Sequence, residues 1–239
     1  MWLSVIIPTL NEEEALPKTV ECVRLQADDP AGLEIIVVDA GSRDRTAVLA
    51  RSLQVPIYIN PELKGLKYAS LNFGVAQSQG DVVLFLDADT YLPKGFDTFI
   101  RHEMTYPKCV GGAFEFRFSS HNFLLWLIEQ INRIRYRVDR RYFGDQAIFC
   151  RKSVFQSVGG YPDQPIMEAA FLCELLSRQG RLHLIQRSIY TSPRRFLAGG
   201  IMPVFLLDFR IWLCYWLRLD IRRFAKHYWS MNDAVQRKG

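Results

Sequence analysis

The stretch KYASLNFGVAQSQGDVVLFLDADT, residues 67–90, joins a segment with helical character to an apolar run that ends in acidic residues. Residues 67–79 predict a helix, which Gly80 closes. Residues 81–90 predict a strand. Because its apolar residues are continuous rather than alternating, we expect this strand to be buried on both faces. Such a unit is typical of a parallel sheet covered by helices.

The same unit recurs upstream of this stretch. Strands are predicted at residues 3–10, 33–42 and 55–60, with helices between them at 11–27 and 43–54. We therefore predict an α/β fold with a mostly parallel central sheet flanked by helices. In such sheets ligands bind at the carboxyl ends of the strands, so the polar residues that follow each strand are the first candidates for a site.

The second half of the chain is less regular. Strands are predicted at 109–118, 145–151 and 182–193, and helices at 122–143, at 152–162 and in the segment that starts at 165. From Gly199 the sequence is aromatic, basic and helical in pattern. Its segment 201–217 reaches the short limit for a membrane span, but Asp208 and Arg210 lie within it, so we expect no span. An interfacial helix on a membrane surface is one alternative, and a helix packed on the core or a dimer contact is the other.

Composition limits the class of protein. The chain has 239 residues, of which 49% are hydrophobic, which suits a sizeable core and excludes a disordered protein. Its net charge of +5 suits an acidic substrate, nucleic acid or an anionic membrane. The five cysteines form no CxxC pair and are expected to be buried thiols in a reducing compartment. Because the N-terminus predicts a strand and not a signal peptide, we expect a cytoplasmic protein, peripheral on the inner face of the membrane if its C-terminal helix binds there.

Two carboxylates stand at the end of the strand at 81–90. Asp87 and Asp89 flank Ala88, and residues two apart at a strand end project to the same side. Carboxylates so placed repel each other unless a cation or a proton joins them. Hard oxygen ligands suit Mg²⁺ or Mn²⁺, which in turn binds diphosphates. This pattern therefore predicts a metal and diphosphate site.

Another acid, Asp39, ends the strand at 33–42 and precedes a turn of small residues. An acid at this place can accept hydrogen bonds from a nucleobase or a ribose. The alternative is that Asp39 or Ser42 caps the following helix.

In their order along the chain, these motifs resemble the family 2 (A-type, inverting) glycosyltransferases. The matching segments are SVIIPTLNEE, IIVVDAGSRDRT, KGLKYASLNFGVAQSQGDVVLFLDADT, GDQAIFCRKSVFQSVGGYP and MEAAFLCELLSRQGR. They cover roughly the first 190 residues and are most similar to a small, single-domain bacterial subgroup. The resemblance implies the nucleotide-diphosphosugar transferase fold. It implies a catalytic domain at 1–198, with a nucleotide-binding half at 1–92 and an acceptor-binding half at 93–198, and a C-terminal amphipathic helical segment at 199–239.

The resemblance also implies roles for individual residues. The residues that would bind the nucleotide sugar are Pro8, Thr9, Leu10, Glu12, Asp39, Gly41, Lys67, Asn72, Asp87, Ala88, Arg194 and Arg195. Asp89 would bind Mg²⁺ or Mn²⁺, and Asp145 would face the acceptor. Arg194 and Arg195 would reach the diphosphate, since the paired N–H groups of arginine suit phosphate oxygens. The alternative is two solvated arginines after a strand.

The mechanism implied is an inverting displacement at the anomeric carbon. A general base removes the acceptor hydroxyl proton, while metal and cationic side chains stabilise the departing nucleoside diphosphate. The family base lies in a Glu-Asp pair after the GGYP loop, but here the pair reads Glu168-Ala169, and Leu66 replaces an arginine that is usual in the subgroup. Three hypotheses stay open. Glu168 is the base, Asp145 or Asp163 replaces it, or the sugar is bound but not transferred.

We therefore expect a metal-dependent glycosyltransferase of the hexosyltransferase type. It would move a sugar from a nucleoside-diphosphate sugar to a hydroxyl acceptor, for which the basic aromatic tail indicates a lipid-linked molecule. The alternative is a catalytically impaired sugar-nucleotide-binding or scaffold protein at the membrane surface. A nucleotidyltransferase is disfavoured because the loop after the first strand has no glycine. Nucleic-acid binding is not expected, because the basic segment 132–143 lacks an accompanying motif and predicts a helix with an aromatic core face and a solvated basic face.

Overall fold

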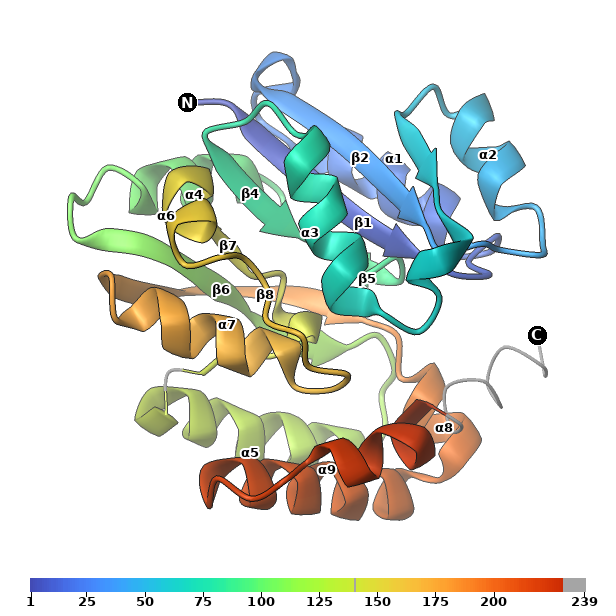
Figure 1. Cartoon of the computed structure of the whole chain (residues 1–239), viewed down its shortest axis with the longest axis vertical. Coiled ribbons are helices and arrows are strands. Elements are labelled where there is room, and N and C mark those ends of the chain that lie inside the picture. Colours follow the sequence, from blue (N-terminus) through green and yellow to red (C-terminus); the bar gives the residue numbers. More distant parts are fainter. Residues whose placement is uncertain (140, 230–239) are drawn as a thin grey trace.

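The computed structural model describes residues 1–139 and 141–229. Its strands form one mixed sheet in the order β3-β2-β1-β4-β7-β6-β8-β5 (Figure 1). The strands are Leu3–Thr9 (β1), Leu33–Asp39 (β2), Ile57–Ile59 (β3), Val82–Phe85 (β4), Thr90–Tyr91 (β5), Cys109–Phe118 (β6), Phe149–Arg151 (β7) and Arg181–Thr191 (β8). The α-helices are Leu16–Gln26 (α1), Thr46–Ser52 (α2), Lys67–Gln77 (α3), Phe96–Glu103 (α4), Phe123–Asp139 (α5), Lys152–Ser157 (α6), Glu168–Ser177 (α7), Arg194–Gly199 (α8) and Ile201–Trp216 (α9).

The first half of the chain forms the parallel part of this sheet, as predicted. β1 lies between β2 and β4 and is parallel to both, and β3 is parallel to β2. Val5 and Ile6, neighbours on β1, are both fully buried, so this strand is covered on both faces. Thr9 and Asp39 are opposite each other in the β1–β2 register. The polar residues after these strands therefore meet at one edge of the sheet.

Beyond β4 the sheet is no longer parallel throughout. β7 is antiparallel to both β4 and β6, β5 is antiparallel to β8, and β6 is parallel to β8. Gly111 and Gly112 of β6 lie where a Cβ atom would clash with the backbone of β7 and β8, so the absence of side chains permits this close approach. The α/β class is confirmed, but the parallel arrangement is confined to the first four strands and the β6–β8 pair.

The observed elements differ from the sequence pattern in several places, among them the strand expected at 145–151, which forms only over Phe149–Arg151 because Gly144–Gln146 forms a 3-10 turn. Residues Phe96–Glu103 form α4, a helix that the pattern does not predict, and its Phe96 and Ile100 are buried four residues apart. The strand expected at 81–90 already ends at Phe85, and the chain turns before the short strand β5.

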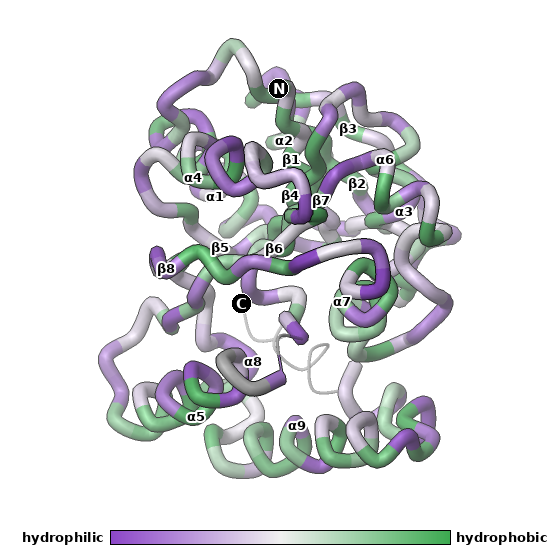
Figure 2. Tube along the Cα trace, turned by 90° about the vertical axis from the view of Figure 1, so that its left-hand side faces the viewer, coloured by the Kyte–Doolittle hydropathy of each residue, from purple (hydrophilic) through white to green (hydrophobic). Residues whose placement is uncertain are grey.

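The helices α5 and α9 lie next to each other at one end of the molecule (Figures 1 and 2). One hydrophobic core runs through both halves of the sheet, and a smaller one joins α7 to α9 through Ile166, Ala170, Leu207 and Ile211. Among the described residues no helix combines the length and the apolar character needed to cross a membrane. The predicted C-terminal segment 199–239 is described as far as Trp229, and its last ten residues lie outside the described part. All five cysteines are free thiols, as expected, but only Cys109, Cys150 and Cys173 are buried, whereas Cys22 and Cys214 are partly exposed.

Candidate active site

A cluster of acidic and basic side chains gathers at the carboxyl ends of β1 and β4. Lys67, at the start of α3, pairs with Asp87 at 2.6 Å (Nζ to Oδ1). Arg194, at the start of α8, donates through both terminal nitrogens to the Glu12 carboxylate, with Nη1 2.7 Å from Oε2. Its Nε lies 3.1 Å from Oδ2 of Asp89. The fold thus brings Glu12 and Arg194, which are 182 positions apart, into one ion pair.

Asp87 and Asp89 approach this cluster for a reason other than the predicted one. Both lie in a turn after β4, in which the Thr90 N–H donates to the Asp87 carbonyl oxygen at 3.1 Å. The alternation of a strand therefore does not orient them. The turn does, and it directs Asp87 toward α3 and Asp89 toward α8.

The cluster carries more negative charge than its cations balance locally. Burial raises the pKa of Asp89 to about 6, and the carboxylates of Asp87 and Glu12 add to this effect against the opposing influence of Arg194. Burial also raises the pKa of Glu12. A further cation would relieve this repulsion, and the available donors are carboxylate oxygens, which Mg²⁺ and Mn²⁺ prefer. The residues present therefore fit a divalent metal beside Asp89.

Glu168, the first residue of α7, lies on the other side of Lys67. A Cβ atom added to Gly144 would lie 3.1 Å from Lys67 Nζ, 3.9 Å from Glu168 Oε1 and 4.0 Å from Asp87 Oδ2, so these three groups surround the bare glycine. Burial raises the pKa of Glu168, an effect that Lys67 partly opposes. Burial disfavours the Lys67 ammonium, but Asp87 and Glu168 together hold its pKa above the usual value. Lys67 is therefore a permanent cation between two carboxylates.

Asp145 supplies a further buried carboxylate. Its Oδ1 atom is buried without a hydrogen-bond partner among the described residues. Burial raises the pKa of Asp145 to about 6, Asp87 adds to the rise, and Arg135 of α5 opposes it. A buried oxygen without a hydrogen-bond donor costs free energy, and the hydroxyl of a bound molecule would supply the missing donor.

Backbone strain surrounds this site. Asn11, Ala147 and Met167 adopt left-handed conformations, with φ of 54°, 47° and 61°. Asn11 lies in the loop after β1, next to Glu12. Ala147 follows the Gly144–Gln146 turn, and Met167 precedes Glu168 at the start of α7. Non-glycine residues in this region cost about 1–3 kcal/mol each and cluster at functional sites.

The predicted nucleotide-side residues form the edge next to this cluster. Pro8 and Thr9 end β1, Leu10 follows them, and Ala88 lies between the two acids of the turn. The Asp39 carboxylate accepts hydrogen bonds from the backbone N–H groups of Gly41 (3.0 Å) and Ser42 (2.9 Å).

It also accepts from the hydroxyls of Ser42 (2.5 Å) and Thr9 (3.2 Å). Asp39 thus fixes the loop that follows it. The helix-capping alternative is wrong, because α2 begins only at Thr46 and has no side-chain cap.

Asn72 and Arg195, two other predicted residues, make contacts outside the acidic cluster. The side-chain amide of Asn72 binds the backbone of Tyr161 through both polar atoms: Nδ2 donates to the carbonyl oxygen at 2.9 Å, and Oδ1 accepts from the N–H at 2.8 Å. Arg195 forms a bidentate ion pair with Asp208 of α9, in which Nη2 lies 2.5 Å from Oδ1 and Nη1 lies 3.0 Å from Oδ2. Its guanidinium carbon lies 4.1 Å from the centre of the Tyr228 ring. The alternative of two solvated arginines is wrong, since both guanidiniums are held in ion pairs.

Three residues of this region were not predicted as part of the site. Arg135 was expected on a solvated basic face, but it lies over the Phe143 ring at 3.7 Å and close to Asp145. The sequence pattern could have pointed to Asp208, because an acid within an apolar helix needs a partner. Nothing in the sequence pointed to Tyr228, since only the fold brings it to Arg195. The side chains of Arg137 and Arg140, in the same basic segment, lie outside the described part.

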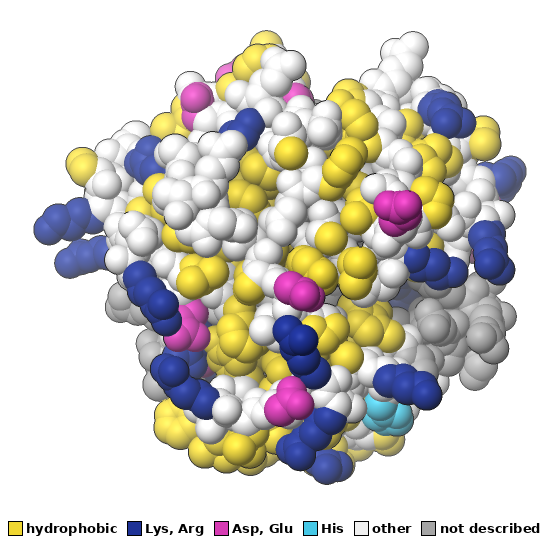
Figure 3. All heavy atoms as spheres, in the orientation of Figure 1, with side chains coloured by type: hydrophobic (Ala, Val, Ile, Leu, Met, Phe, Trp, Pro, Cys, Tyr) yellow, Lys and Arg dark blue, Asp and Glu magenta, His cyan; other side chains and the backbone are white. Residues whose placement is uncertain are grey.

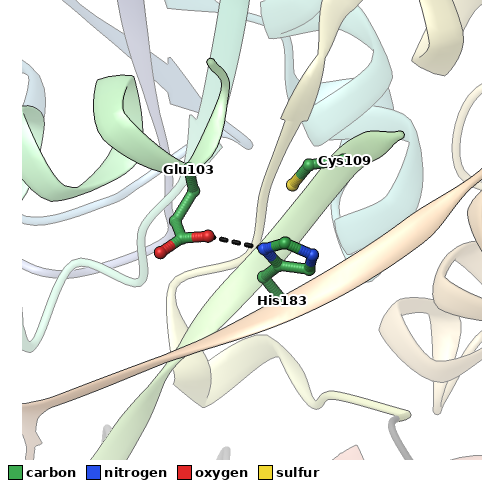
Figure 4. A group of neighbouring side chains, drawn as sticks. All are labelled: Glu103, Cys109 and His183. Atoms are coloured by element: carbon green, nitrogen blue, oxygen red, sulfur yellow. Dashed lines mark hydrogen bonds and ion pairs between the residues drawn. The ribbon is translucent and has the colours of Figure 1, made fainter. Parts of the chain in front are cut away.

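A second group of potential ligands lies at the amino ends of β6 and β8. Glu103, Cys109 and His183 offer atoms within 4.8 Å of one another (Figure 4). His183 Nδ1 and Glu103 Oε2 are 2.5 Å apart, and the Cys109 thiol donates to the Gly111 carbonyl at 3.4 Å. These groups already have protein partners, and they lie at the opposite ends of these strands from the acidic cluster.

Solved structures identify the class of fold. Staphylococcus aureus TarS 1–349 in complex with UDP matches with a TM-score of 0.63 and 18% identity, covering 84% of this chain and 66% of that one. The mannosyltransferase PcManGT from Pyrobaculum calidifontis, in complex with GDP-Man and Mn²⁺, matches with a TM-score of 0.64 and 18% identity, covering 87% and 64%. The fold is thus that of the A-type nucleotide-sugar transferases.

The sequence gives the family. The profile of Glycosyl transferase family 2 matches residues 4–156, and the chain therefore belongs to this family of glycosyltransferases. Glycosyltransferase AglE of Haloferax volcanii is 30% identical over 178 residues, which are 69% of this chain and 57% of AglE. A β-1,3-glucosyltransferase of Campylobacter jejuni, named for GalNAc(5)-diNAcBac-PP-undecaprenol, is 36% identical over 98 residues, 39% of this chain and 31% of that protein.

A dolichyl N-acetyl-α-D-glucosaminyl phosphate glycosyltransferase of Methanococcus voltae is 24% identical over 265 residues, covering all of this chain and 75% of that protein. The chain spans between about a quarter and three fifths of the length of the first curated relatives that it matches.

Proposed function

We propose that this protein is a metal-dependent, inverting glycosyltransferase that moves a sugar from a nucleoside-diphosphate sugar to a hydroxyl on a lipid-linked acceptor. The observation that carries this proposal is the meeting of Asp87 and Asp89 with Lys67, Arg194 and Glu168 at the carboxyl edge of the sheet. The arrangement provides cations for a diphosphate and buried carboxylates for a metal and a proton.

On the donor side, Asp89 would hold Mg²⁺ or Mn²⁺, with Asp87 and Glu12 nearby. When bound, the metal would stabilise negative charge on the departing diphosphate. Lys67 and Arg194 are already cations in this position, and they would bind and orient the diphosphate oxygens without a change of protonation. Arg194 would exchange part of its contact with Glu12 for the phosphate.

On the acceptor side, we assign the general base to Glu168. Its raised pKa makes its carboxylate a better proton acceptor than an exposed glutamate, and Lys67 beside it stabilises the ionised form that must take the proton. Asp145, with its unpartnered oxygen, would accept a hydrogen bond from an acceptor hydroxyl and orient it. Asp163 is a weaker candidate, because it is bound by the Tyr68 hydroxyl in the loop before α7.

The surroundings of position 169 are apolar, which suits the absence of a second carboxylate there. Ala169 is 3% exposed and belongs to the main hydrophobic core, whereas Glu168 lies beside Lys67. The lipid-linked acceptor is proposed from the relatives, two of which are named for undecaprenol- or dolichyl-linked molecules. A reaction on such an acceptor would take place at a membrane surface, for which we propose the inner face.

Ala169 also favours a second candidate function, a protein that binds a sugar nucleotide without transferring the sugar. Hydrolysis of UDP-, GDP- and dTDP-sugars, measured with and without Mn²⁺ alongside thermal shifts for the same panel, separates the two. We expect one nucleotide to raise the melting temperature only with Mn²⁺, and its sugar to be released slowly.

The variant Asp89→Asn should lose both the shift and the release, whereas Asp163→Asn, an isosteric change outside the cluster, should keep both. A metal-dependent shift without any release would favour the binding function. No shift with any nucleotide would contradict both.

A further inference from the structure

Helix α5 presents an apolar stripe to the outside. Phe123, Leu127, Ile131 and Ile134 follow one another at spacings of four, four and three, which places them along one side of the helix. They are all exposed, Phe123 to 73% and Ile134 to 66%. Among the described side chains of α5, every exposed one is apolar. We call these four residues the α5 stripe.

Three charged residues of α5, Glu129, Arg133 and Arg135, contact the protein instead. Glu129 accepts a hydrogen bond from the Phe118 N–H at 2.7 Å. Arg133 pairs with Glu115 at 3.8 Å, and Arg135 donates to the Arg141 carbonyl at 3.1 Å. An ordinary surface helix has the opposite arrangement, with its charged face in water. The inversion indicates that the outer face of α5 meets an apolar environment.

Helix α9, beside α5, also presents apolar residues to the outside, although its Arg210 is exposed as well. Its exposed residues Met202, Leu206, Phe209, Leu213 and Trp216 form a second apolar line, the α9 stripe. Its inner side carries Asp208, bound to Arg195, among the buried Leu207 and Ile211. Figures 1 and 2 place both helices at the same end of the molecule, and the outward stripes together give an apolar end face. Exposed apolar patches of this kind mark interaction sites.

Positive charge borders the apolar end face. Arg210, Arg218, Arg222, Arg223 and Lys226 are exposed on or after α9. A pocket at the end of α9 is lined by Arg141, Arg178 and Arg218, with Glu174 as its acidic residue. Figure 3 shows apolar and basic side chains together at this end. Two copies of the chain would bring these like charges together, whereas the headgroups of anionic lipids would attract them.

We propose that α5 and α9 together dock this protein on the surface of a bilayer that contains anionic lipids, with both stripes buried among the acyl chains. The proposal deepens the function proposed above and rests on it for its purpose. The inner sides of the same two helices hold Arg135, near Asp145, and Asp208, which binds Arg195. The acceptor side of the site would thus lie about one helix diameter, 10 Å, above the membrane surface, within reach of a lipid-linked hydroxyl.

Flotation of the full chain with vesicles tests the participation of α5. Wild type should float with phosphatidylcholine vesicles that contain phosphatidylglycerol and bind pure phosphatidylcholine more weakly. The double variant Leu127→Asp/Ile134→Asp should lose binding by about tenfold or more, although α9 is intact. The matched control is Leu25→Asp/Val48→Asp, at positions 70% and 61% exposed away from this face, which should bind as wild type does. Melting curves check that each variant is folded.

Quenching of tryptophan fluorescence by brominated lipids shows which part of the protein contacts the bilayer. Trp126, exposed on α5, should account for part of the quenching, so Trp126→Phe should reduce it. Trp2, exposed near the N-terminus, should not contribute, and Trp2→Phe should leave it unchanged. Binding of the α5 double variant at wild-type strength would overturn the proposal. A wild-type dimer in sedimentation that the same variant dissociates, without vesicle binding by either, would assign the face to a second copy.

Donor hydrolysis in the absence of vesicles keeps the two proposals apart. The α5 double variant changes no residue of the acidic cluster and should release sugar at the wild-type rate. If wild type hydrolyses a donor but does not bind vesicles, the docking proposal is wrong and the glycosyltransferase proposal is retained. If it binds vesicles but neither binds nor hydrolyses a donor, the transferase is wrong.

Discussion

Glu168 is the residue on which the proposed chemistry depends most. It is buried at the start of α7, and the Lys67 ammonium lies between it and Asp87. If it removes the acceptor proton, Glu168→Gln should reduce transfer by about 10²–10⁴-fold, because a positioned base contributes that much. Steady-state rates with the donor found in the nucleotide panel measure the loss.

The amide is isosteric, so donor binding in the thermal-shift assay should persist in Glu168→Gln. Asp163→Asn is the control and should retain the wild-type rate. A normal rate in Glu168→Gln together with a large loss in Asp145→Asn would move the base to Asp145.

The buried carboxyl of Asp145 predicts a particular dependence of stability on pH. Its pKa is about 6 in the folded protein, above the ordinary value of 3.8, so between these two values the folded state binds its proton more tightly than the unfolded state does. The stabilisation from the protonated form is complete below about pH 4 and is lost as the pH rises through 6. Asp145→Asn, which cannot ionise, should escape this loss.

Urea unfolding of both proteins at pH 4, 5, 6 and 7 measures the difference. The free energy of unfolding of Asp145→Asn, relative to wild type, should rise by about 2 kcal/mol across this range. A relative stability that does not change with pH would show that Asp145 is solvated in the folded protein.

At the scale of elements, α3 positions the loop that leads into α7. Asn72 on α3 binds both the N–H and the carbonyl of Tyr161. A Cβ atom on Gly160 would lie 2.5 Å from Oδ1 of Asn72. Asn72→Ala would leave the Tyr161 N–H and carbonyl without these partners. We expect it to lower the free energy of unfolding by about 2–3 kcal/mol and to reduce turnover, because the loop that leads to Glu168 would shift.

Asn132→Ala is the matched control, since the hydrogen bonds of the Asn132 amide with described residues all lie within α5. It should change stability by less than about 0.5 kcal/mol. Equal losses in the two variants would mean that the Asn72 amide has no special part in holding the loop.

At the scale of the whole molecule, the pair of Arg195 and Asp208 joins α8, which carries Arg194 of the acidic cluster, to α9. Both side chains are partly buried, with exposed fractions of 18% for Arg195 and 32% for Asp208, and Arg195 also lies over Tyr228. Asp208→Ala leaves the Arg195 cation without its partner and should lower the free energy of unfolding by about 3 kcal/mol. Arg195→Met/Asp208→Leu should recover most of that stability, because apolar residues of similar size replace a buried pair at little cost.

Chemical denaturation of Arg195→Met, Asp208→Leu and the double variant that combines them gives the coupling energy of this pair. Near-additive losses would mean that α9 is held to the rest of the protein by its apolar contacts alone.

The sequence by itself determined the α/β class, the strands β1 to β4 and the family, because continuous apolar runs and short motifs are local properties of the chain. It also indicated the acids after β4 and the helix start at Glu168. It could not show the turn that orients Asp87 and Asp89, the antiparallel strand β7, or the Arg194–Glu12 pair, since each depends on segments far apart in the chain. The inverted amphipathicity of α5 is the clearest case: the same apolar and basic residues predict a helix, but only the packing of its basic residues against Glu115 and Phe143 decided which side meets the surroundings.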